Sequence, residues 1–177
     1  MPRRLRPSRP RPVVEVTTIP FWRRKRLDQM TRDEWESLCD GCGKCCLHKL
    51  EDADTGEIAM TDVSCSLLDL ETCRCTDYGN RQAKVPDCVK LTRANLPKLR
   101  WLPDTCAYRL LYQGNDLPEW HYLVSGDRNA VHAAGQSVKG KAVSEAEVED
   151  LERHVTDWLN NAGGDWIYVP EKDPIEC

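Results

Sequence analysis

The stretch Cys39-Asp-Gly-Cys-Gly-Lys-Cys-Cys46 places four cysteines within eight residues. Two consecutive C-x-x-C steps let tight turns bring several sulfurs toward one ion, and Gly41 and Gly43 give the backbone the freedom that such turns need. Thiols gathered this densely are typical of metal ligands rather than of a hydrophobic core. The stretch therefore predicts a chain that is organised around bound metal.

Six further cysteines follow this stretch. They are Cys65, Cys73, Cys75, Cys88, Cys106 and Cys177. The N-terminal sequence has too much proline for a transit helix and no apolar stretch for export, which predicts a cytoplasmic protein whose thiols stay reduced. Neighbouring cysteines such as Cys45 and Cys46 are also awkward for structural disulfides and natural for metal ligation. A disulfide scaffold is therefore not expected.

Charge is distributed unevenly along the chain. Residues 1–26 hold nine Lys and Arg against one Glu, whereas residues 27–177 hold 16 basic and 28 acidic side chains. An acidic body argues against a nucleic-acid-binding face, so only the basic tail is a candidate for a nucleic-acid contact. No apolar run approaches the roughly 18 residues of a membrane span, so no membrane partner is expected. Nothing in the sequence identifies a protein partner.

Nine cysteines, from Cys39 to Cys106, are available for metal. The backbone would be strained if Cys45 and Cys46 both bound the same tetrahedral ion. We therefore expect each of them to bind a different ion, or one of them to bridge two ions. One site would then take Cys39, Cys42, Cys45 and a remote thiol. A second site would combine Cys46 with thiols drawn from Cys65, Cys75, Cys88 and Cys106, and Cys73 is left over.

The metal itself remains open between zinc and iron. The spacing Cys39-x2-Cys42-x2-Cys45 matches the three-ligand run of a [4Fe–4S] ferredoxin site, although the Cys-Pro pair that follows in ferredoxins is absent. The simple turn geometry of the C-x-x-C steps and the lack of surrounding residues typical of an electron-transfer site favour zinc. The all-sulfur ligand set instead suits iron–sulfur chemistry. His48, two residues after Cys46, is a secondary ligand candidate. His121 is expected to be a hydrogen-bonded core residue.

Local patterns predict an α+β fold with an irregular, cysteine-rich, metal-stapled centre and several short helices. Thr31 and Glu34 form a capping box that predicts a short helix leading into Cys39. Short strands are expected at 58–63 and 138–143. An apolar piece lies at 67–70.

Helices are also expected in the second half of the chain. A helix at 92–99 is interrupted by Pro97, and another begins at Asp104 and ends at Gly114. An amphipathic C-terminal helix is predicted over 144–162, because Ser144 and Glu147 form a second capping box before an apolar stripe. The expected organisation is a disordered basic tail at 1–19, a metal-binding domain at 20–162 and a C-terminal extension at 163–177.

Beyond these patterns, the chain resembles a known bacterial family. The motif C-x-x-C-x-x-C-C at 39–46, followed by Cys65, by Cys75-x-x-Tyr78 and by Pro86-x-Cys88, is similar to the cysteine-cluster family called YkgJ-like, a zinc- or iron-chelating domain. The sequence around this motif is similar to that of the YcgN-type subgroup, for example at Trp101-Leu-Pro-Asp-Thr-Cys106 and Leu117-Pro-Glu-Trp-His121. In the broader family an Arg stands directly before this Pro, whereas here Arg81 lies five residues before Pro86.

This resemblance implies a set of metal ligands but no established activity. The shared thiols fall on Cys39, Cys42, Cys45, Cys46, Cys65, Cys75, Cys88 and Cys106, and Cys73 belongs to the subgroup pattern. The expected function is zinc or iron chelation without catalysis. Alternatives are an iron–sulfur redox or sensing protein, a subunit of a modifying enzyme, or a zinc enzyme with an open ligand position assisted by His48 or His121.

Overall fold

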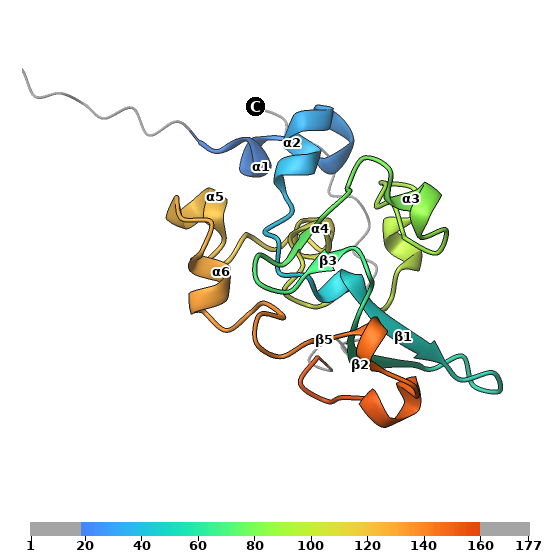
Figure 1. Cartoon of the computed structure of the whole chain (residues 1–177). Helices are drawn as coiled ribbons and strands as arrows, with labels where there is room; N and C mark the ends of the chain where they lie inside the picture. The colour runs from blue at the N-terminus through green and yellow to red at the C-terminus, as the bar shows by residue number, and fades with distance from the viewer. Residues whose placement is uncertain (1–18, 160–177) are drawn as a thin grey trace, which may run out of the picture.

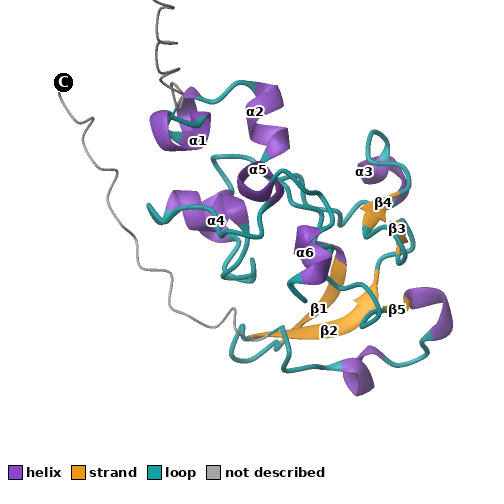
Figure 2. Cartoon of the chain, turned by 90° about the vertical axis from the view of Figure 1, so that its left-hand side faces the viewer, coloured by secondary structure: helices purple, strands orange, loops and turns teal. Residues whose placement is uncertain are grey.

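The computed structural model describes residues 19–159 of the 177-residue chain. Short helices and short strands alternate with long irregular connections, which confirms the predicted α+β class. Helices α1 (Phe21–Arg24) and α2 (Arg32–Ser37) lie at one end of the molecule. Strands β1 (Leu47–Glu51), β2 (Ile58–Ser64) and β5 (Val143–Ser144) lie at the other, as two perpendicular views show (Figures 1 and 2). The cysteine-rich segment 39–46 joins these two ends.

The helices are short, with four or six residues each. They are α1 (Phe21–Arg24), α2 (Arg32–Ser37), α3 (Arg81–Lys84), α4 (Ala107–Tyr112), α5 (Tyr122–Ser125) and α6 (Ala130–Ala133). Single 3-10 turns stand between them at Leu27–Gln29, Lys44–Cys46 and Leu96–Lys98, and two more follow α6 at Glu145–Glu147 and Leu151–His154. The predicted capping box is present at α2, where the Thr31 and Glu34 side chains each accept the other residue's backbone N–H.

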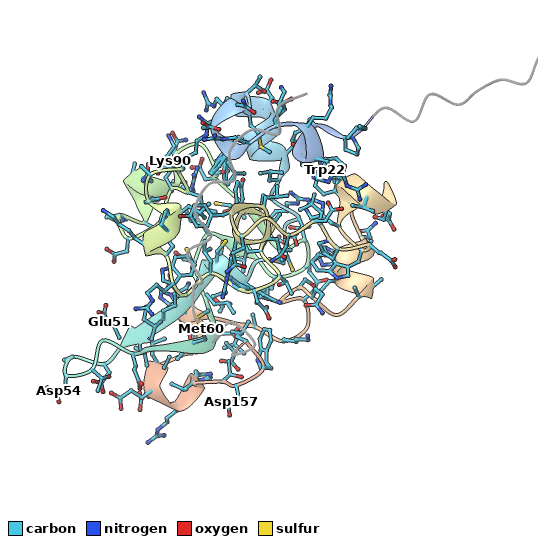
Figure 3. All side chains as sticks on the ribbon, turned by 180° about the vertical axis from the view of Figure 1, so that it is seen from behind. Trp22, Glu51, Asp54, Met60, Lys90 and Asp157 are labelled. Atoms are coloured by element: carbon cyan, nitrogen blue, oxygen red, sulfur yellow. The ribbon has the colours of Figure 1, made fainter. Side chains whose placement is uncertain are left out.

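Two small sheets complete the fold. Strand β1 (Leu47–Glu51) pairs antiparallel with β2 (Ile58–Ser64), and β5 (Val143–Ser144) adds to β2 in parallel. Strands β3 (Leu68–Asp69) and β4 (Arg74–Cys75) form a separate antiparallel ribbon. Figure 3 shows Asp54 at the outer tip of the β1–β2 hairpin, far from Trp22 in α1.

Two hydrophobic cores hold these elements together. The first forms around Trp35, Leu38 and Tyr108, and the second around Leu47 and Val138. Leu38 immediately precedes the cysteine-rich segment and Leu47 immediately follows it. The segment is therefore anchored in a different core at each of its ends.

The predicted C-terminal helix over 144–162 is wrong for the residues that the structure describes. Residues 144–159 contain two 3-10 turns separated by the extended residue Val148, and 160–162 lie outside the described range. The Asp150 side chain accepts the Glu152 N–H and starts a new turn, which interrupts any helix there. Val155 then forms a bridge to Thr61, so the segment runs beside β2.

Three other predictions need smaller corrections. The expected helix at 92–99 is reduced to one 3-10 turn containing Pro97. Helix α4 begins after Cys106 rather than after Asp104. Only the last residue of the predicted strand at 138–143 lies in a strand, because Val138 instead packs against the cysteine-rich segment. Among residues 19–159, no helix has the length and apolar character needed to cross a membrane.

Candidate metal centre

Four of the predicted ligands line one small cavity. The thiol-bearing residues are Cys39, Cys42, Cys45 and Cys106, and the cavity encloses about 30 Å³. Its remaining wall is mainly apolar and is built from Leu38, Asp40, Leu91, Leu102, Pro103, Ala107 and Tyr108. A space of this size holds one ion or one or two water molecules. The structure thus places Cys106, which the sequence indicated as one of the candidates for a second site, beside the three cysteines of the first.

A compact turn presents the first three thiols to this cavity. The buried Asp40 side chain accepts the Cys42 N–H at 2.9 Å and so closes the turn. Gly41 and Gly43 have φ values of +79° and +77°, a conformation that costs a residue with a Cβ atom free energy. The chain then enters the 3-10 turn Lys44–Cys46. The predicted role of both glycines is confirmed.

Neighbouring segments fix the turn in place. A Cβ atom at Gly43 would lie 2.7 Å from Cγ2 of Val138, so glycine permits the close approach of the two segments. The Val138 N–H donates to the Cys42 carbonyl at 2.9 Å. On the other side, the Arg74 guanidinium packs against Gly41, where a Cβ atom would lie 3.0 Å from Cζ.

The end of α2 is held by three aromatic or imidazole side chains. The Tyr108 hydroxyl donates to the Trp35 carbonyl at 2.9 Å, and the Tyr122 hydroxyl donates to the Ser37 carbonyl. The His121 Nε2–H donates to the Leu38 carbonyl at 3.0 Å, while His121 Nδ1 accepts the Leu123 N–H. The bonds to Ser37 and Leu38 satisfy carbonyls that the helix end leaves unpaired, whereas the Trp35 carbonyl also accepts the Leu38 N–H. His121 is fully buried and is the hydrogen-bonded core residue that the sequence predicted.

Lys44 connects the turn to the segment that carries Cys106. The Lys44 side chain is buried, and its Nζ donates to Thr105 Oγ1 at 3.2 Å and to Gln136 Oε1 at 3.3 Å. Thr105 directly precedes Cys106, so this contact positions the fourth thiol relative to the other three.

A second group of thiols lies next to the first. Leu47 pairs with Ser64 in the β1–β2 hairpin, which places Cys46 opposite Cys65, and the Cys65 N–H donates to the Cys46 carbonyl at 2.9 Å. Burial raises the pKa of the Cys88 thiol, and the charge of Arg81 opposes that rise.

Neighbouring groups and burial shift the pKa values of the individual thiols in different directions. Burial raises the pKa of Cys106 to about 12 and raises that of Cys42 as well. The neighbouring Cys46 side chain and the Lys49 ammonium lower the pKa of Cys45, whereas the Cys45 side chain raises the pKa of Cys46. Most of these thiols are therefore protonated without a cation, and a bound metal ion would displace their protons.

Three predicted ligands lie in other surroundings. Cys73 is buried in the second hydrophobic core and has a φ value of +54°. Cys75 lies in β4 directly across from Leu68, a residue of that same core. The His48 imidazole hydrogen-bonds with the Glu145 carboxylate. The structure therefore does not place these residues in the cavity.

The described residues offer no ready-made metal site. Within 19–159, no three His, Cys, Asp or Glu side chains converge closely enough to hold an ion as they stand. Binding therefore requires thiols to change rotamer around a backbone that is already in place.

A comparison with known protein families matches the thiol-rich part of the chain. Residues 38–107 match the model of the CxxCxxCC family, described as a "Putative zinc- or iron-chelating domain". These residues include every cysteine from Cys39 to Cys106. No solved structure matches the chain.

Relatives that align over most of their own length identify the family of this chain. A UPF0260 protein of Parvibaculum lavamentivorans is 62% identical over 141 residues, covering 78% of this chain and 92% of the relative. A UPF0260 protein of Rhizobium etli is 59% identical over 164 residues, covering 92% of this chain and all of the relative. The chain belongs to the UPF0260 family.

In this UPF0260 chain the donor set fits zinc or iron. Cysteine sulfur is a preferred ligand of Zn²⁺ and of iron in sulfur-rich sites, and four thiols line a cavity of ionic size. Sequence reasoning missed two residues of this centre, Asp40 and Lys44. The Asp-Gly pair after Cys39 is a turn signal that could have indicated Asp40. No local pattern indicates that Lys44 is buried, because its partners lie 61 and 92 residues away.

Proposed function

We propose that the chain is a cytoplasmic metal-binding protein that chelates zinc or iron through clustered cysteine thiolates. The observation that carries the proposal is the cavity shared by Cys39, Cys42, Cys45 and Cys106. The chelating description of the matched domain supports the same chemistry. The flanking sequences quoted above favour the YcgN-type subgroup of these proteins.

The lining of the cavity favours a metal ion at this position. Four of the lining residues are cysteines, and the rest of the wall is mainly apolar. Four thiolates would complete a closed tetrahedral site, which is typical of structural metal rather than of catalytic zinc with an open position. A bound ion would supply positive charge to thiols that burial otherwise keeps protonated.

The position of the cavity suggests what the metal does for the protein. The segment 39–46 runs between the two hydrophobic cores, and Cys106, directly before α4, packs against the first of them. An ion held by these residues would fasten the segment to the first core. We propose that the metal-binding domain spans residues 20–162.

Metal analysis of a matched set of variants tests the proposal. Full-length protein purified without oxygen and without an affinity tag should contain zinc or iron, and Cys106→Ser should lose metal. Cys177→Ser, which removes a thiol far along the sequence from this segment, should keep the full amount. If Cys106→Ser does not fold, Cys106→His, which retains a ligand, should fold and bind metal. A wild-type protein that folds and binds neither metal would contradict the proposal.

A further inference from the structure

Two cysteines outside the metal cavity stand opposite each other at the base of the β1–β2 hairpin. Leu47 pairs with Ser64 in this hairpin, so the next residues outward, Cys46 and Cys65, form the following antiparallel position. The Cys65 N–H donates to the Cys46 carbonyl at 2.9 Å, as expected where two opposite residues are hydrogen-bonded. Both thiols are free, and neither residue lines the metal cavity.

A single carboxylate holds the two strands together beside this pair. The Glu145 Oε1 atom accepts the Ser66 N–H at 2.9 Å, and its other oxygen hydrogen-bonds with the His48 imidazole. Ser66 directly follows Cys65, and His48 lies two residues after Cys46. The backbones of the two cysteines are therefore kept opposite each other by their own hydrogen bond and by the Glu145 side chain.

The spacing of such a pair suits a disulfide bond. Cα atoms at a hydrogen-bonded antiparallel position are about 5.5 Å apart, and disulfides form at Cα separations of about 4.4–6.8 Å. Partners in an antiparallel pair also direct their side chains to the same face. A disulfide between Cys46 and Cys65 therefore needs side-chain rotation but no change of strand register. Their Cβ atoms start about 5 Å apart, whereas a relaxed disulfide prefers about 3.8 Å, so the bond would be easily reduced.

The two thiols have different surroundings. Cys46 packs against the second hydrophobic core, whereas Cys65 belongs to neither core of the described residues and is followed by the exposed Ser66. The Leu67 N–H donates to the Cys65 Sγ at 3.5 Å, and a donor of this kind stabilises the negative charge of an attacking sulfur. Cys65 is therefore placed to react first with a molecule from solvent, and Cys46 is placed to react second.

We propose that Cys46 and Cys65 are a redox-active pair that exchanges with small-molecule disulfides and closes reversibly into a disulfide across the hairpin base. Glutathione disulfide represents this class of oxidant. The Cys65 thiolate attacks one of its sulfurs, which breaks the S–S bond, forms a mixed disulfide and releases one glutathione thiolate. The Cys46 thiolate then attacks the Cys65 sulfur and releases the second. The chain loses two electrons and two protons, and two glutathione molecules take them up as thiols.

This pair adds a redox reaction to the proposed metal-binding function and does not depend on it. The cavity thiols are the ligands in that function, whereas Cys46 and Cys65 keep their sulfurs free for exchange. Cys46 shares the 3-10 turn Lys44–Cys46 with the cavity residue Cys45, so the disulfide lies next to the metal centre without using its ligands. Reversible disulfides in reducing compartments are typically catalytic or redox-sensing.

Thiol mapping of the full-length protein tests the pair. Protein purified without oxygen is incubated with glutathione disulfide, with and without added zinc, then alkylated, digested and analysed by mass spectrometry. A Cys46–Cys65 disulfide should form under both conditions without loss of bound zinc, and dithiothreitol should reverse it. Protection of both thiols by zinc would overturn the proposal, because they would then be metal ligands. Oxidation of other cysteines while this pair stays reduced would overturn it as well.

Two variants test the order of the reaction. Cys46→Ser should stop at a mixed disulfide between glutathione and Cys65, because the second attacking sulfur is missing. Cys75→Ser, which removes another half-buried thiol outside the cavity, should still form the Cys46–Cys65 disulfide. Glutathione bound to other cysteines of Cys46→Ser but not to Cys65 would contradict the assigned order. If Cys46→Ser does not fold, the disulfide mapped in the wild-type protein still decides whether the pair exists.

Metal content and thiol mapping together distinguish the two proposals. A folded protein that binds neither zinc nor iron but forms the Cys46–Cys65 disulfide contradicts only the metal-binding function. A protein that binds metal but never forms this disulfide contradicts only the redox pair.

Discussion

At the scale of single residues, Gly43 is the position where sequence and packing constrain the centre most tightly. Its φ value is +77°, and a Cβ atom there would meet Cγ2 of Val138 at 2.7 Å. Gly126 has nearly the same φ value, +78°, but nothing within 4 Å of the corresponding position. Substitutions at these two glycines therefore separate the cost of backbone strain from the cost of steric overlap.

We expect Gly43→Ala to destabilise the protein more than Gly126→Ala. Both variants incur the strain of a left-handed conformation, about 1–3 kcal/mol. Only Gly43→Ala adds overpacking against Val138, for which a further cost of about 1–3 kcal/mol is typical. Urea unfolding at matched metal content measures both free energies. Equal losses in the two variants would show that the segments separate easily and do not fix the turn.

Lys44 is the second residue whose role can be isolated. We expect Lys44→Met to reduce metal affinity by about 10–100-fold, as for other residues that position ligands. The reason is that the variant loses the bonds to Thr105 and Gln136 that place Cys106 relative to the turn. Lys141→Met is the matched control, since the Lys141 ammonium is exposed and donates to the Gly135 carbonyl. Competition titration with a zinc indicator compares them, and unchanged affinity in Lys44→Met would contradict this role.

At the scale of elements, the end of α2 depends on a neutral histidine. Burial lowers the pKa of His121 below its usual value of 6.5, and His121 Nδ1 accepts a backbone N–H in the folded protein. As the pH falls below 6.5, the unfolded chain takes up a proton that the folded protein does not. The stabilisation by neutral His121 is present above pH 6.5 and is lost as the pH falls toward the lowered folded pKa.

This behaviour predicts a specific pH dependence. Below pH 6.5 the wild-type free energy of unfolding should fall with pH, with a His121 contribution of up to about 1.4 kcal/mol per pH unit. His121→Gln should have a shallower slope, while His154→Gln serves as the surface control. Denaturant unfolding between pH 5 and pH 7, at equal metal content, gives the slopes. Identical slopes in wild type and His121→Gln would refute the assignment.

The elements also show how far the sequence could be interpreted. The capping box at Thr31, the strand at 58–63 and the glycine turns were predictable because each depends on neighbouring residues. The run 144–159 has helical periodicity, but Asp150 caps a new turn and Val155 pairs with β2. The position of Cys106 beside Cys39, Cys42 and Cys45 could not be predicted, because it depends on the packing of α4, which spacing does not reveal.

At the scale of the whole molecule, metal should contribute a large part of the stability. The elements are short, and the thiol-bearing segment links two separate cores. Structural zinc sites contribute about 10–16 kcal/mol in small domains. Treatment with a strong chelator should therefore shift the urea midpoint well below that of the metal-bound protein, and added zinc should restore it. A midpoint that does not change on metal removal would show that the cores suffice.

The most direct test of the account is metal analysis combined with an absorption spectrum. It requires full-length protein purified without oxygen and without a metal-affinity tag. The account predicts at least one ion per chain, either zinc without visible absorption or iron with thiolate-to-metal bands. A folded protein with only traces of zinc and iron, which also fails to take up either when supplied, would contradict it.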